Sequence, residues 1–134
     1  MRILTTAIIA LFISTAFMAC KKDSDKPEKS TVGAEGLYTG KYGFDSETPH
    51  IDYSLNLKVG GIIEEIGQSS GNAVGRGTWK LNGNQLTASY TMLFEPFSDY
   101  FLVATFDPSA KTLTGTWGFE SNGTDGGKFI MATK

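Results

Sequence analysis

The sequence predicts an all-β domain that folds as a small eight-stranded antiparallel up-and-down barrel. Three observations support this fold class. Short segments alternate apolar and polar residues with a period of two, which is typical of strands with one buried face. Turn signals rich in glycine, asparagine and proline separate these segments. No window of the sequence shows the apolar stripe of an amphipathic helix. A β-sandwich is the alternative arrangement of the same strands.

The clearest strand is "IDYSLNLKVG", in which every second residue from Ile51 to Val59 is apolar and the residues between are polar. Segments 62–67 and 99–106 are less regular, because their apolar residues fall on both parities. The eight expected strands are 36–44, 51–59, 62–67, 73–81, 85–93, 99–106, 111–119 and 127–133.

Two later segments repeat the alternation and are flanked by turn signals. In "QLTASYTM", the residues from Leu86 to Met92 alternate with glutamine, threonine and serine. In "KTLTGTWGFE", the apolar residues alternate with threonines. Asn82-Gly83-Asn84 predicts a tight hairpin, since glycine accepts the positive φ that such a turn requires. Residues 107–110 and 122–126 are similar turn sequences.

A meander of eight strands removes its exposed edges when the sheet closes into a barrel. A barrel of this size is just wide enough to be filled by side chains or to hold one small ligand. Because many of the inward side chains are large, we expect a mostly filled lumen with at most a shallow pocket near one mouth. The expected inward residues are Tyr38, Tyr42, Phe44, Tyr53, Leu55, Leu57, Trp79, Tyr90, Trp117 and Phe119.

A glycine stands two residues before an aromatic residue at three places, in Gly40-Lys41-Tyr42, Gly77-Thr78-Trp79 and Gly115-Thr116-Trp117. Such a glycine leaves room for a neighbouring ring and lets the strand coil sharply. The pattern resembles the lipocalin-like and avidin-like barrels of the calycin group, which carry Gly-X-Trp on their first strand. Here Gly-Thr-Trp lies on the fourth and seventh expected strands instead. The resemblance implies a barrel that binds a small ligand or a protein, and it carries over no site residue.

The first nineteen residues have the composition of a secretory signal peptide. Met1 and Arg2 supply positive charge, and the following "ILTTAIIALFISTAFMA" is uncharged. An uncleaved membrane anchor is the alternative. This run is at the short limit for crossing about 30 Å of hydrocarbon, and its threonines and serine dilute it.

The only cysteine of the chain, Cys20, follows this run directly. Phe17-Met18-Ala19-Cys20 resembles a bacterial lipobox, and "CKKDSD" is similar to the mature start of lipoproteins in the Bacteroidetes. The resemblance implies that Cys20 is lipidated and that the protein is anchored to the outer membrane, on its periplasmic or surface side. Two or more acyl chains hold a protein stably, whereas one is marginal. An ordinary apolar cysteine within the signal segment is the alternative.

The chain is therefore expected to divide into three parts. Residues 1–19 are the signal peptide, residues 20–34 are the lipidated cysteine with a flexible charged linker, and residues 35–134 are the barrel domain. Seven of the fourteen residues from Lys21 to Ala34 are charged, so this linker cannot bury enough apolar surface to fold. A coil of this length spans roughly 20 Å.

The domain contains seven basic and eleven acidic residues, which give a formal charge near −4. It lacks the basic stripe that displaces counterions from phosphates, so nucleic acid is not an expected partner. His50, the only histidine, is interpreted as part of a polar loop and not as a metal ligand. Glu64 and Glu65 are neighbours on a strand and face opposite sides, so they cannot form the carboxyl pair of a glycosidase. We expect no catalytic site, no metal site and no cofactor.

Aromatic residues are the candidates for a ligand-binding surface. Phe94, Phe97 and Tyr100 lie in or beside the connection "LFEPFSDYF", while Trp79 and Trp117 belong to the expected inward set. The rings of the connection could form an apolar lip at the barrel mouth. The alternative, which we favour, is that they cap the barrel and complete its core.

The sequence thus predicts a membrane-anchored, non-enzymatic lipoprotein whose barrel binds a small apolar ligand or a partner at its mouth. The alternative is a structural or inhibitory module with a filled core that contacts another protein at the cell surface. The expected partners are the membrane, through Cys20, and either a small apolar ligand or a cell-surface protein.

Replacement of the cysteine tests the anchor. We expect Cys20→Ser to release the protein into the soluble fraction or to leave it unprocessed, because serine has no thiol to receive the acyl chains. Cell fractionation and labelling with radioactive palmitate measure this. Absence of palmitate from the wild-type protein would contradict the anchor.

Overall fold

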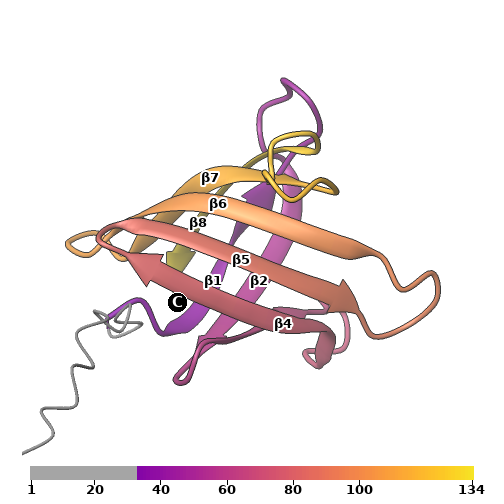
Figure 1. Cartoon of the computed structure of the whole chain (residues 1–134), viewed down its shortest axis with the longest axis horizontal. Coiled ribbons are helices and arrows are strands. Elements are labelled where there is room, and N and C mark those ends of the chain that lie inside the picture. The colour runs from indigo at the N-terminus through magenta and orange to yellow at the C-terminus, as the bar shows by residue number, and fades with distance from the viewer. Residues whose placement is uncertain (1–32) are drawn as a thin grey trace, which may run out of the picture.

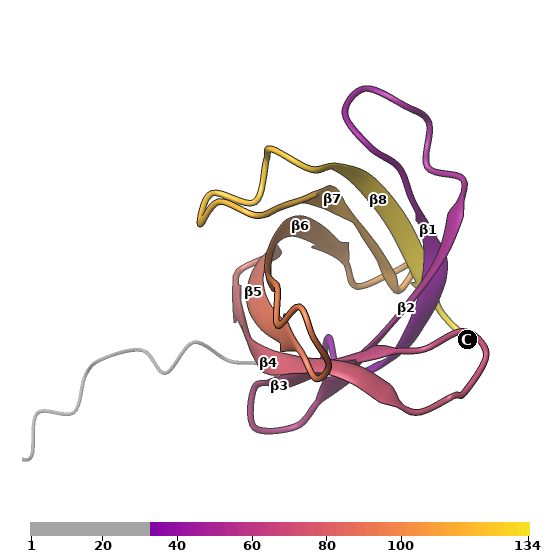
Figure 2. The same ribbon diagram turned by 90° about the vertical axis from the view of Figure 1, so that its right-hand side faces the viewer.

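The computed structural model describes residues 33–134, which form one closed sheet of eight antiparallel strands (Figures 1 and 2). The strands follow one another around the barrel in chain order, and the first pairs with the last to close it. The predicted barrel is confirmed, its architecture is consistent with a small lipocalin-like barrel, and the sandwich alternative is excluded. The strands are β1 (Gly36–Tyr42), β2 (Ile51–Lys58), β3 (Ile62–Ile66), β4 (Ala73–Asn82), β5 (Gln85–Met92), β6 (Asp99–Asp107), β7 (Thr112–Gly118) and β8 (Gly127–Thr133).

The expected signal peptide, Cys20 and the linker as far as residue 32 lie outside the described residues. Within residues 33–134 there is no helix that is long and apolar enough to cross a membrane.

All eight strands lie where the sequence predicts them, with small differences at their ends. β1 ends at Tyr42, two residues early, because the chain turns at Asp45, whose φ is 48°. β7 ends at Gly118, because the Asp125 side chain then accepts hydrogen bonds from the next two backbone amides. Phe44 and Phe119 therefore lie in connections and not in strands.

The two ends of the barrel differ in their connections. At one end, here called the closed end, the strands are joined by the short turns 59–61, 83–84 and 108–111. At the other end lie four longer connections, here called the mouth loops, with residues 43–50, 67–72, 93–98 and 119–126. The predicted hairpin at Gly83 is confirmed, with a φ of 61°.

The chain enters the barrel at the closed end. Ala34 is completely buried, and its carbonyl accepts a hydrogen bond of 2.9 Å from the Tyr38 hydroxyl. Lys111, in a closed-end turn, donates a hydrogen bond of 2.8 Å from Nζ to the Gly33 carbonyl. These contacts attach the start of the domain to the end opposite the mouth loops.

Large side chains fill the closed half of the lumen. Trp79 is buried, and its indole Nε1 donates a hydrogen bond of 3.1 Å to the Lys58 carbonyl at the closed end. Other fully buried core side chains are Tyr38, Leu55, Leu57, Ile63, Leu86, Leu102, Leu113, Phe129 and Met131.

Most of the expected inward residues are indeed buried, but two are not. Phe44 is 44% exposed and Phe119 is 52% exposed, because both follow the last residue of a strand and lie at the rim of the mouth. Tyr42 is partly buried and packs against the core.

The three glycines of the Gly-X-aromatic pattern lie where neighbouring strands approach closely. A Cβ atom at Gly40, Gly77 or Gly115 would overlap a backbone carbonyl of the adjacent strand, at Ile130, Ser89 or Val103 respectively. The conflict is with backbone, which cannot turn aside as a flexible side chain can. The expectation that these glycines leave room for a neighbouring ring is wrong, because a backbone carbonyl lies closest at each of them.

The glycine contact predicts a large loss of stability. Gly77→Ala should destabilise the domain by about 3 kcal/mol or more, because the added methyl group requires the β4–β5 pair to separate. The exposed neighbour supplies the control, since Thr78→Ala should cost no more than about 0.5 kcal/mol. Urea unfolding of both variants measures the difference. Equal midpoints would contradict the close strand contact.

Candidate functional site

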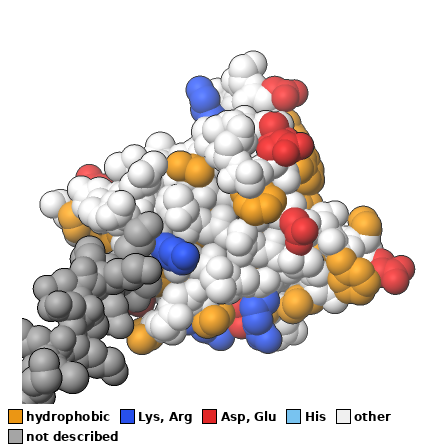
Figure 3. Space-filling model, viewed as in Figure 1, with side chains coloured by type: hydrophobic (Ala, Val, Ile, Leu, Met, Phe, Trp, Pro, Cys, Tyr) orange, Lys and Arg blue, Asp and Glu red, His pale blue; other side chains and the backbone are white. Residues whose placement is uncertain are grey.

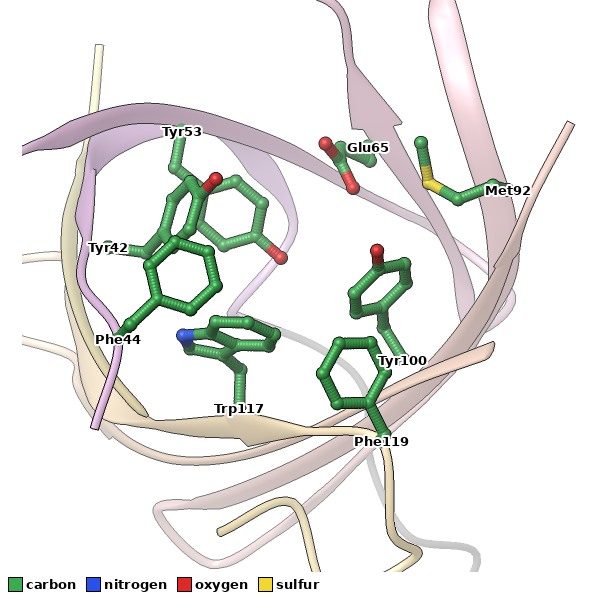
Figure 4. A pocket seen from close by; sticks show the side chains of 8 residues that line it. All are labelled: Tyr42, Phe44, Tyr53, Glu65, Met92, Tyr100, Trp117 and Phe119. Atoms are coloured by element: carbon green, nitrogen blue, oxygen red, sulfur yellow. The ribbon is translucent and has the colours of Figure 1, made fainter. Parts of the chain in front are cut away.

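A pocket opens at the end of the barrel that carries the mouth loops (Figure 4). Its volume is about 300 Å³, which is the lower end of the range for small-molecule sites. A water molecule takes about 30 Å³ in the liquid, so this space accommodates roughly ten non-hydrogen atoms. The residues that line this pocket, here called the mouth pocket, are Tyr42, Phe44, Tyr53, Glu65, Met92, Tyr100, Trp117 and Phe119.

Trp117 is the centre of an aromatic wall on one side of the mouth pocket. Its ring lies edge-to-face with those of Tyr42, Phe44 and Phe119, at centroid separations of 5.5, 5.3 and 5.6 Å. The indole Nε1 donates a hydrogen bond of 3.0 Å to the Gly43 carbonyl. Because packing and this hydrogen bond both hold the indole, the wall is formed before any ligand arrives.

A second group of rings continues this wall. Tyr100 stacks on Tyr90 with their centroids 5.4 Å apart, and it lies 5.3 Å from the ring of Phe119. On the opposite flank, Tyr42 and Tyr53 meet edge-to-face at 5.3 Å. Figure 4 shows Tyr42, Tyr53 and Tyr100 converging on a common space from different strands.

Glu65 places a carboxyl group in this aromatic space. It lies across the mouth pocket from Trp117 and beside Met92 (Figure 4). Burial raises the pKa of Glu65 above its ordinary value of 4.5, and a hydrogen bond with the Tyr90 side chain opposes this rise in part. An ionised carboxylate can only accept, so the Tyr90 hydroxyl is the donor. The Tyr53 hydroxyl lies 2.8 Å from that of Tyr90 and is left to donate to it.

The local backbone brings Tyr90 to the carboxyl group. Glu65 is paired with Gly75 of β4, and the register shifts immediately after it, as in a β-bulge. A Cβ atom at Gly75 would lie 2.7 Å from the Tyr90 ring and 3.3 Å from the Glu65 Cβ. Glycine at this position therefore allows the phenol and the carboxyl group to meet inside the barrel.

The adjacent Glu64 has the opposite environment. It points outward, where Lys58 Nζ and Arg76 Nη2 lie 2.7 and 2.8 Å from its carboxylate oxygens. Hydrogen bonds from Lys58 and then Arg76 lower the pKa of Glu64. The two neighbouring glutamates therefore face opposite sides of the sheet, as the strand period predicts.

The structure separates the five residues that the sequence singled out for ligand binding. Tyr100 and Trp117 line the mouth pocket. Trp79 is buried toward the closed end and is not part of its lining. Phe94 and Phe97 lie in the mouth loop 93–98, are 53% and 62% exposed, and are also outside the lining. The interpretation that these two phenylalanines complete the core is therefore wrong, because their loop projects beyond the last pairs of β5 and β6.

His50 lies on the surface, in the first mouth loop. Its Nδ1 is 3.0 Å from the Thr48 carbonyl and 4.0 Å from the Glu47 carboxylate. Across residues 33–134, no group of three or more histidine, cysteine, aspartate or glutamate side chains is placed to hold a metal ion.

Sequence reasoning missed Glu65 and Met92 as lining residues. The signal for Glu65 was present, because it shares strand parity with Ile63, which is fully buried, and it pairs with the inward Leu55. The apolar Ile62 and Ile66 concealed this parity, since they make β3 look apolar on both faces. Met92 has the same parity as Tyr90 and lies at the mouth end of β5.

Comparisons of this chain with protein-family models, with curated proteins and with solved structures find no match. The chemistry of the mouth pocket therefore has to be inferred from its own side chains.

The raised pKa of Glu65 predicts a pH-dependent loss of stability. Folding favours the protonated carboxyl group, so its contribution is complete below about pH 4.5 and is lost as the pH rises through the folded-state pKa. At pH 7.5 we expect Glu65→Gln to have a larger free energy of unfolding than the wild type. The expected gain is about 0.5–2 kcal/mol, which is typical of a stabilising substitution. Near pH 4 the two proteins should be equally stable.

Urea unfolding at both pH values measures this effect. Glu47→Gln, which removes an exposed carboxylate from a mouth loop, should change neither value by more than about 0.5 kcal/mol. A Glu65→Gln protein that is less stable than the wild type at pH 7.5 would show that the fold stabilises this carboxylate.

Proposed function

We propose that this protein is a non-enzymatic binding lipoprotein of the bacterial cell envelope, anchored to the outer membrane through Cys20. Its barrel binds a small, largely apolar ligand in the mouth pocket. The observation that supports this proposal is the pocket itself, a preformed space of about 300 Å³ walled mainly by aromatic side chains. Concave sites with apolar walls and few polar groups are typical of small-molecule binding.

The position of the chain entry supports the anchored arrangement. Gly33 and Ala34 are held at the closed end, opposite the mouth loops. A lipid at Cys20 would therefore attach the barrel by its closed end, through a linker of roughly 20 Å. The mouth pocket would then open away from the membrane, toward ligands in the surrounding aqueous space.

An exposed apolar loop favours a second candidate function. Leu93, Phe94 and Phe97 are each at least half exposed in the mouth loop 93–98. Clustered exposed apolar side chains often mark a protein-contact surface. The second candidate is thus a structural or inhibitory module that uses this loop to contact a cell-surface protein.

Filling the mouth pocket tests the first proposal. Met92→Trp would place an indole in the pocket, whereas Leu93→Trp adds the same ring one residue later, in the exposed loop. We expect the domain produced without its lipid to bind naphthalene with a micromolar or weaker dissociation constant, measured by equilibrium dialysis. The affinity should fall at least about tenfold in Met92→Trp, because the binding volume is lost, and should be unchanged in Leu93→Trp.

Circular dichroism should first show that both tryptophan variants are folded. Undiminished naphthalene binding by Met92→Trp would contradict ligand binding in the mouth pocket. Nanomolar, stoichiometric binding of a fluorescent fatty acid would indicate a lipid carrier instead. Loss of a cell-surface partner in Phe94→Ser and Phe97→Ser, with no ligand bound by the wild type, would favour the second candidate.

A further inference from the structure

We propose that the mouth pocket selects a small organic cation, an amine or quaternary ammonium compound with an apolar body. Its positive charge would lie between the Glu65 carboxylate and the aromatic wall around Trp117. This inference rests on the proposed ligand-binding function and specifies the chemical class of the ligand. Three independent features of the described residues support it.

The first feature is the aromatic wall. Aromatic faces carry partial negative charge and attract cations that approach within about 6 Å of the ring centroid, and tryptophan is the strongest of them. Tyr42, Tyr100 and Trp117 face the same space. The ring centroid of Trp117 lies 5.5 Å from that of Tyr42 and 6.0 Å from that of Tyr100. Several rings around one space form the kind of cage that recognises quaternary ammonium groups.

The second feature is a partly buried carboxyl group with no cationic partner. Within residues 33–134 the ion pairs with lysine or arginine involve Asp52 and Glu64, and none involves Glu65. No lysine, arginine or histidine is among the side chains that line the mouth pocket. An unpaired charge in an apolar site is costly, and a bound cation would compensate it.

The third feature is the charge of the loops around the opening. The four mouth loops contain five carboxylates and no lysine or arginine. In the view of Figure 3, carboxylates gather along the side on which these loops project. Such a field raises the local concentration of cations and speeds their entry. The five acidic residues of the mouth loops are Asp45, Glu47, Glu95, Glu120 and Asp125.

The same features disfavour other ligands. An anion such as a fatty acid would meet the acidic loops and the Glu65 carboxylate. A neutral apolar molecule would fill the space but leave the partly buried Glu65 carboxylate without a cationic partner. A metal ion prefers several oxygen ligands, whereas the lining supplies one carboxylate group. A cation with an apolar body satisfies both the carboxylate and the rings.

Proton linkage gives the site a recognisable signature. Burial raises the pKa of Glu65, so below that folded-state pKa a cation that needs the ionised form must displace a proton. The titratable groups that face Glu65 from the other strands are tyrosines, on β1, β2, β5 and β6, and tyrosine ordinarily titrates near pH 10. Burial raises the pKa of Tyr42, Tyr53 and Tyr90 still further, so they do not ionise between pH 4 and 8. The tyrosine on β6 is Tyr100, which lines the mouth pocket together with Glu65.

Three probes of nearly equal shape test the inference on the full-length protein in maltoside micelles. Choline is the cation, 3,3-dimethyl-1-butanol is its neutral isostere, and 3,3-dimethylbutanoate is the anion. Isothermal titration calorimetry at pH 7.5 should show choline binding at least about tenfold more tightly than the alcohol. Choline does not titrate, so its affinity should increase as the pH rises through the folded-state pKa of Glu65, and its binding below that pKa should release protons to the buffer.

Two isosteric variants distinguish direct contact between the cation and Glu65 from attraction of the cation by the acidic mouth loops. Glu65→Gln should weaken choline binding at least about tenfold, remove its pH dependence and leave the affinity for the alcohol unchanged. Glu47→Gln, in a mouth loop, should weaken choline binding less than about threefold, because an exposed charge is screened. Urea unfolding checks that both variants are folded.

Equal affinity of the wild type for choline and the alcohol would overturn the cation inference and leave the pocket a site for neutral ligands. Preference for 3,3-dimethylbutanoate would overturn it as well. Choline affinity that is unchanged in Glu65→Gln would show that this carboxylate does not bind the cation. Ligand binding as such is tested separately with naphthalene and Met92→Trp, so the failure of either proposal can be recognised.

Discussion

The width of an eight-stranded barrel is the constraint on which this structure depends. Closure between β1 and β8 leaves no open sheet edge, and the enclosed lumen has room for only one layer of large side chains. Tyr38, Trp79 and Leu113 fill the closed half. Close strand contacts at Gly40, Gly77 and Gly115 allow the sheet to coil around this core. At the other end the strands finish before the lumen is filled, and the remaining space is the mouth pocket.

Glu65 is a carboxyl group in an environment that disfavours its ionised form. Its burial raises the pKa of the carboxyl group, which means that the ionised form is disfavoured in the folded protein. Tyr90 reduces this cost by hydrogen bonding but supplies no compensating charge. A carboxyl group whose ionised form is disfavoured by burial, in a preformed aromatic pocket, is a candidate for a binding role. The exterior Glu64 shows the contrast, because Lys58 and Arg76 neutralise it.

The sequence was sufficient to predict the barrel, because alternation and turn chemistry specify the strands locally. It also placed Tyr100 and Trp117 among the candidates, and both line the mouth pocket. It could not show that Phe44 and Phe119 lie at the rim of the mouth, because this depends on the residues at which β1 and β7 stop pairing with their neighbouring strands. The role of Glu65 depends on pairing with a distant strand, which the two-sided apolar pattern of β3 concealed.

The central claim is that ligands occupy the mouth pocket and not the exposed loop beside it. Intermolecular nuclear Overhauser effects between naphthalene and the domain test this directly. We expect contacts with the Met92 methyl group and the Trp117 indole, which line the pocket. Contacts confined to Phe94 and Phe97, which lie in the exposed loop, would contradict it.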